Sequence, residues 1–184
     1  YMTGYKDPRM SMYFLQPMTA GQRKYIGCRA GAAIGSNIVA KRLYSTVNVQ
    51  ETTPSLWLTA SEMAFCKAEG VLRGWNMGGG TAKEYYERGV TLSFNQWGAD
   101  GVVNYLLDDT STEANYADAL GGFGGAAAKA STITIKWDDN APMDEKMERL
   151  ITQKWIALFP NGQEAWNEIR RTGYPRIFSV PQAT

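Results

Sequence analysis

Apolar side chains recur at helical spacing in three segments of this 184-residue chain, and this periodicity constrains the fold more than any other feature. In the first segment the spaced residues are Trp57, Ala60, Ala64, Ala68, Val71 and Trp75. Steps of three or four give one apolar helical face. We predict a helix with Thr53 as N-cap and Pro54 in the first helical position. A Glu69–Arg73 pair one turn apart supports it, and Gly74 begins its exit.

A second helix is predicted from Thr81, because Thr81-Ala-Lys-Glu84 has the form of a capping box. Its inner face would carry Ala82, Tyr85, Tyr86, Gly89, Val90 and Trp97. Gly98 can supply the left-handed residue that ends it. Two helices joined by a short glycine-rich loop pack antiparallel, as in tetratricopeptide-like hairpins.

A third helix is predicted from Asn140 and Pro142 to Pro160, and a final one from Gln163 to Thr172. The third helix carries Met143, Met147, Leu150, Ile151, Trp155 and Leu158 on one face. Residues 112–120 could form a short helix. The stretch STITIKW alternates polar and apolar residues, which indicates either a half-buried strand or an extended lid on a helical core. We therefore predict a mainly α fold of tetratricopeptide-like hairpins with long irregular loops and at most a short strand or hairpin.

Composition excludes several classes of function. No stretch approaches the roughly 20 apolar residues of a membrane helix. Nineteen basic and eighteen acidic residues leave a net charge of +1 and no basic stripe, so nucleic acid is not an expected partner. The chain has no histidine, which removes the usual general base and any histidine-ligated metal. Cys28 and Cys66 are expected to be buried small apolar side chains, and a disulfide between them stays open.

Three motifs carry a family resemblance. LWLTASEMAFCKAEGVLRGWNMGGGTAKEYYERGV resembles the helical segment of SusD/RagB proteins, in which a Gly-Thr-Ala loop separates two helices. LITQKWIALFPNGQEAWNEIRRTGYPRI is similar to a second signature of that family, and DPRMSMYF to its early turn. The similarity covers roughly residues 5–14 and 55–178.

The resemblance implies a surface-exposed lipoprotein of the outer membrane in Bacteroidetes-type cells, without enzymatic activity. Such a protein captures oligosaccharide for a polysaccharide utilisation system and hands it to a TonB-dependent, SusC-like barrel. Residues 1–184 would be the carboxy-terminal part of a SusD-like domain, with an irregular loop region at 1–50 and a helical core at 51–184. We expect a fragment of a longer chain, with membrane contact only through a lipid anchor outside it.

Two other functions remain open from the helical pattern. One is a tetratricopeptide-type protein-interaction module without sugar affinity. The other is a glycoside hydrolase, which would need two carboxylates across a cleft. No cofactor is expected, although clustered loop oxygens near Asp138 and Asp139 could hold a structural calcium ion.

Glycan binding requires exposed aromatic rings beside hydrogen-bonding side chains, and loops are where such rings are free. The predicted glycan-binding residues are Tyr5, Tyr13, Tyr25, Trp97 and Tyr105. Each has polar neighbours in sequence, but for any single one of them packing in the core is the competing explanation. No catalytic residue is predicted.

Overall fold

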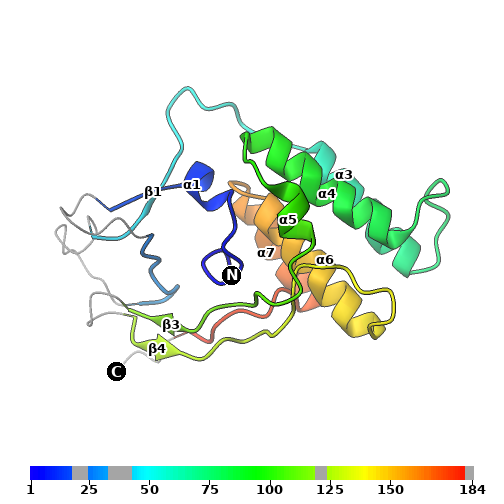
Figure 1. Cartoon of the computed structure of the whole chain (residues 1–184). Coiled ribbons are helices and arrows are strands. Elements are labelled where there is room, and N and C mark those ends of the chain that lie inside the picture. The colour runs from blue at the N-terminus through cyan, green and yellow to red at the C-terminus, as the bar shows by residue number, and fades with distance from the viewer. Residues whose placement is uncertain (18–24, 33–42, 119–123, 181–184) are drawn as a thin grey trace.

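The protein is mainly helical, as predicted, in a computed structural model that describes residues 1–17, 25–32, 43–118 and 124–180. The helices are α1 (Met10–Tyr13), α3 (Ala60–Leu72), α4 (Ala82–Trp97), α5 (Val102–Leu106), α6 (Met143–Ala157) and α7 (Gly162–Thr172). Two antiparallel ribbons pair β1 (Phe14–Leu15) with β2 (Thr46–Val47) and β3 (Tyr116–Ala117) with β4 (Ala126–Ala127). Helices α3 to α7 gather on one side of the molecule and both ribbons lie on the other (Figure 1). Among the described helices, none combines the length and apolar character needed to cross a membrane.

Helix α3 begins later than predicted. Its N-cap is Thr59, whose side chain accepts a hydrogen bond from the Glu62 amide, rather than Thr53. Thr53 instead closes a local turn by accepting from the Gln50 amide at 2.8 Å. The residues between the two threonines therefore lie outside the helix, and Trp57 is 89% exposed. The predicted exit is confirmed, since Gly74 has a positive φ.

Helix α4 packs antiparallel to α3, and its predicted ends are confirmed. Thr81 and Glu84 form a complete capping box, and Gly98 ends the helix in the left-handed conformation. The two helices approach closely at Gly89, where the Ser61 hydroxyl donates to the Gly89 carbonyl at 2.8 Å. The Phe65 ring fills the space that a side chain at position 89 would occupy. This contact sets the separation of the helix pair.

Helices α6 and α7 follow the prediction, and ion pairs join them to α3. Lys154 on α6 lies 2.9 Å from Glu168 on α7. Arg171 pairs with both Glu168 and Glu69, the latter on α3. Burial alone would raise the pKa of Glu69, but Arg171 and Arg73 outweigh it and hold that pKa below its usual value. Trp166 on α7 is 51% exposed.

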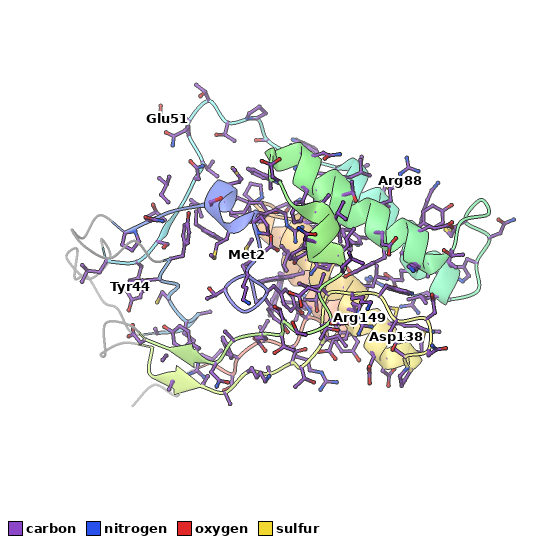
Figure 2. All side chains as sticks on the ribbon, viewed as in Figure 1. Met2, Tyr44, Glu51, Arg88, Asp138 and Arg149 are labelled. Carbon is purple, nitrogen blue, oxygen red and sulfur yellow. The ribbon has the colours of Figure 1, made fainter. Side chains whose placement is uncertain are left out.

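Residues 131–137 were predicted to form either a half-buried strand or an extended lid, and the structure has the lid. These residues alternate in burial but do not pair in a strand ladder. Ile133, Ile135 and Trp137 are buried against the helices. Three consecutive carbonyls of this lid accept hydrogen bonds from side chains: Ile133 from Tyr5, Thr134 from Arg149, and Ile135 from Tyr86. The buried Nη1 of Arg149, a residue labelled in Figure 2, has no hydrogen-bond partner among the described residues. Side chains thus replace the neighbouring strand.

Two further expectations are wrong. Residues 112–118 are not helical, and residues 116–117 form β3 instead; positions 119 and 120 lie outside the described residues. The reason is that the buried Glu113 carboxylate accepts the Ala130 and Ser131 amides, which holds this segment extended beside the later chain. Cys28 and Cys66, expected to be buried, are both exposed and both free thiols.

Candidate functional site

Three of the five predicted glycan-binding residues lie in the core. Tyr5, Tyr13 and Tyr105 are only 2%, 1% and 5% exposed. Stacking on a sugar needs an accessible ring face, and these three rings have none in this structure. Tyr25 and Trp97 are partly exposed. The structure brings Tyr13 and Trp97 together, with ring centroids 4.9 Å apart.

Tyr105 belongs to a buried polar cluster around Arg9, which the DPR turn places in the core. The Arg9 guanidinium pairs with Asp7 at 2.6 Å and donates to Ser93 at 3.0 Å and Gln153 at 2.9 Å. The Tyr105 hydroxyl donates to Asp7 at 2.8 Å. Burial raises the pKa of Tyr105 well above its usual value, so the phenol stays protonated. The cluster joins the early turn to α4, α5 and α6 and has a structural role.

A groove of about 760 Å³, which we call the aromatic groove, lies among the described residues. Its lining is rich in aromatic side chains: Tyr1, Tyr13, Phe14, Tyr25, Tyr116, Trp155, Phe159 and Phe178. Met2, another lining residue, is labelled in Figure 2. A mostly apolar concavity with a few polar groups is typical of a small-molecule site. The aromatic groove is therefore the candidate functional site.

The floor of the aromatic groove is a stack of rings. Tyr13 at the end of α1 and Phe159 after α6 lie face to face with centroids 4.3 Å apart. Phe14 meets Phe159 edge-on at 5.3 Å. Trp97 supports this stack at 5.5 Å from Phe159, and its buried indole Nε1 has no hydrogen-bond partner in the described structure. The stack fixes the positions of the rings that face the groove.

The outer wall of the aromatic groove depends on Arg29, which joins three segments far apart in sequence. Its guanidinium donates to the carbonyls of Gly124 and Ala126, in the β3–β4 region, and to that of Ser179 in the terminal tail. Its backbone amide donates to the Tyr116 hydroxyl at 3.2 Å. Tyr25 and Phe178 lie in the segments that Arg29 ties together. Arg29 thus positions the wall.

Several polar groups of the lining stay available to a ligand, among them the Trp155 indole N–H, which makes no hydrogen bond to any described residue. The Tyr25 hydroxyl and the side-chain nitrogen of Asn161 make no hydrogen bond to any described residue, whereas the Asn161 oxygen caps α7 at Glu164. Hydroxyl and amide groups are suited to binding sugar hydroxyls. Of the predicted residues, Tyr25 is thus the one that combines a partly exposed ring with a free polar group in the groove.

Asp138 and Asp139 lie in the turn that precedes α6 (Figure 2 labels Asp138). The Asp138 carboxylate accepts the Asn140 amide, and the Asp139 carboxylate accepts the Trp137 indole N–H. Over the described ranges, no group of three or more His, Cys, Asp or Glu is placed to hold a metal ion. A calcium ion near this turn stays a prediction that only metal titration can test.

Sequence reasoning did not identify most of the groove. Phe14, Tyr116, Phe159 and Phe178 carry no local signal of a binding site, because a ring in a loop and a ring in the core look alike in sequence. The helical spacing of Trp155 pointed to the core of the third predicted helix instead. Phe14 and Phe159 meet only once the chain has folded. The nearest signal was Pro160, whose helix-ending role places Phe159 at the edge of α6.

Comparison with known proteins shows similarity over the whole chain. A family model described as SusD-like, for SusD and RagB outer membrane lipoproteins, matches residues 1–184. A search of curated protein sequences finds no match.

Solved structures resemble this chain closely. A SusD homologue from Bacteroides thetaiotaomicron is 44% identical with a TM-score of 0.90, covering 98% of this chain and 38% of that one. One from Bacteroides uniformis is 45% identical with a TM-score of 0.90, covering 96% and 36%. A chitin-binding SusD homologue from Flavobacterium johnsoniae is 42% identical with a TM-score of 0.87, covering 97% and 36%. This chain thus spans well under half the length of the proteins it matches.

Proposed function

This chain belongs to the SusD-like family of outer membrane lipoproteins, and from that premise we propose that it binds glycans in the aromatic groove. The family description places the protein at the outer membrane as a lipoprotein, as its motifs implied. The observation that carries the proposal is the convergence of aromatic side chains on one groove of about 760 Å³. Pyranose rings have apolar faces that stack on such side chains, while neighbouring polar groups bind the hydroxyls.

Chitin oligosaccharides are the first ligands to test. A relative that is 42% identical over 97% of this chain is described as chitin-binding. The acetamide methyl of N-acetylglucosamine would gain from burial against the groove's rings, while Tyr25 and Asn161 offer hydrogen bonds to the same sugar.

The proposed mechanism is capture followed by handover to a TonB-dependent, SusC-like barrel, without bond cleavage. A glycosidase needs two carboxylates across its cleft. Of the described residues that line the groove, Glu113 alone carries a carboxylate, and its charge is bound by backbone amides. This lining supports binding rather than hydrolysis.

Titration calorimetry with chitin hexasaccharide tests the proposal. We expect saturable binding by the wild-type chain and at least about tenfold weaker binding after Tyr25→Ala or Phe178→Ala, because each change removes a stacking ring. Trp57→Ala is the matched control, since it removes an aromatic ring that is 89% exposed and outside the groove. Release of reducing sugar should stay at background.

The outcomes separate the alternatives. Silence on a broad glycan array would overturn glycan binding and favour a protein-interaction module. If Trp57→Ala and Tyr25→Ala lowered the affinity for chitin hexasaccharide equally, the site would lie outside the groove. Sustained sugar release, lost on changing one carboxylate, would establish a hydrolase.

A further inference from the structure

The aromatic groove has two charged side chains among its described lining residues, Arg29 and Glu113. Arginine is the side chain best suited to carboxylate and sulfate groups, because its fork of N–H donors matches two oxygens. A free arginine in the groove would therefore favour acidic glycans. The availability of Arg29 decides which glycans the groove can accept.

The Arg29 guanidinium is not available. All three of its nitrogens donate to backbone carbonyls, with Nε 2.8 Å from the Ser179 oxygen and Nη1 3.4 Å from both the Gly124 and Ala126 oxygens. Nη2 donates to the Ser179 carbonyl and hydroxyl. An incoming anion could bind Arg29 only by breaking the wall that this residue assembles.

Glu113 places a negative charge at the groove, and no side-chain cation among the described lining residues pairs with it. Glu113 is only 3% exposed. Its carboxylate accepts hydrogen bonds from the Ala130 amide at 2.6 Å and from the Ser131 amide at 2.8 Å. Over the described part of the chain, Glu113 forms no ion pair within 4.0 Å. A buried carboxylate of this kind repels a second anion, since the low local dielectric weakens screening.

We propose that the aromatic groove selects uncharged saccharides and excludes those that carry carboxylate or sulfate groups; this inference rests on the proposed glycan-binding function. The groups left free in the described lining include the Tyr25 hydroxyl and the Asn161 side-chain nitrogen, and both are neutral. An anion that enters loses its hydration and finds no unengaged side-chain cation among the described lining residues in return. A neutral pyranose loses only hydroxyl hydration, which those two groups and the rings replace.

Three hexasaccharides of equal length test the selection. Chitin and cellulose hexasaccharides are both uncharged, and only the chitin hexasaccharide carries acetamide groups. Hyaluronan hexasaccharide has a carboxylate on every second sugar. Titration of the whole chain in about 0.15 M salt, where the screening length is about 8 Å, limits attraction by distant charges. We expect both neutral hexasaccharides to bind at least about tenfold more tightly than hyaluronan. Tyr25→Ala should weaken both neutral ligands together.

Each other result overturns a different step. Hyaluronan binding as tight as that of the neutral ligands would refute the selection while leaving glycan binding intact. Cellulose hexasaccharide binding as weakly as hyaluronan would show that acetamide groups, and not charge, decide. If Tyr25→Ala left the affinity for the neutral hexasaccharides unchanged, the aromatic groove would not be the site that selects them. If no glycan bound, the proposed function itself would be refuted.

Discussion

Arg9 is the residue whose role the sequence disclosed least. The DPR motif shows an acidic and a basic residue two positions apart, which is the pattern of an ordinary surface turn. In the fold the Arg9 side chain is fully buried, and its partners Ser93 and Gln153 lie 84 and 144 residues away. No local pattern encodes contacts over such separations. The burial of the Arg9 guanidinium is therefore determined by the tertiary structure and not by the local sequence.

Replacement of Arg9 should be far more costly than replacement of a surface cation. Arg9→Met leaves the Asp7 carboxylate buried without its charged partner, and we expect a loss of about 3–5 kcal/mol in the free energy of unfolding. Lys136→Met is the control, because Lys136 pairs with Asp109 at a similar distance, 2.9 Å, on the exposed surface. It should cost less than about 1 kcal/mol. Urea denaturation measures both, and similar small losses would contradict the structural role of the cluster.

At the scale of elements, helix ends were predictable where their signals are adjacent in sequence. The capping box at Thr81 and the glycines at 98 and 173 lie at the predicted ends of α4 and α7. The start of α3 was misjudged because Pro54 favoured Thr53 as the N-cap. The signal for Thr59 was present, since Thr59-Ala-Ser-Glu62 has the same capping-box form as the start of α4. The lid at residues 131–137 shows the same limit, since alternation predicts which side chains are buried but not what binds the backbone.

The α3–α4 contact at Gly89 gives a test of helix packing. A glycine inside a helix normally gains about 0.5–1 kcal/mol on replacement by alanine. Here the added Cβ would lie 2.8 Å from the Phe65 ring, so Gly89→Ala should instead lose about 1–3 kcal/mol in the free energy of unfolding. Gly162→Ala in α7, whose Cβ would meet nothing within 4 Å, is the control and should be neutral or stabilising. A stabilised Gly89→Ala variant would disprove the close approach.

At the scale of the whole molecule, the aromatic groove was the least predictable feature. The sequence identified Tyr13 and Tyr25 as candidates, and the structure places both in the groove lining, although Tyr13 is buried. It could not show that segments near residues 14, 29, 116, 159 and 178 converge, because their contacts depend on the arrangement of helices and ribbons. Tyr5 and Tyr105 were indistinguishable from surface tyrosines for the same reason.

Loss of the Arg29 side chain should separate binding from folding. Arg29→Met releases the tail and the β3–β4 region from one another, so chitin hexasaccharide should bind at least about tenfold more weakly. The helical core does not contain these contacts, so the free energy of unfolding should fall by only about 1–2 kcal/mol. Arg88→Ala on the exposed side of α4 is the control for loss of an arginine and should change neither quantity (Figure 2 labels Arg88). Calorimetry and urea denaturation on the same samples decide the outcome.

The lid at residues 131–137 also bears on how this protein avoids self-association. Its composition, with alternating isoleucine and threonine before a tryptophan, is that of segments that add to one another as strands in fibrils. Templating of that kind requires a free row of backbone acceptors. Tyr5, Arg149 and Tyr86 already occupy three consecutive carbonyls, so a second copy of the segment finds no edge to join. The three side chains that hold the lid to the helices therefore also leave no free run of carbonyls from residue 133 to residue 135 with which another strand could pair.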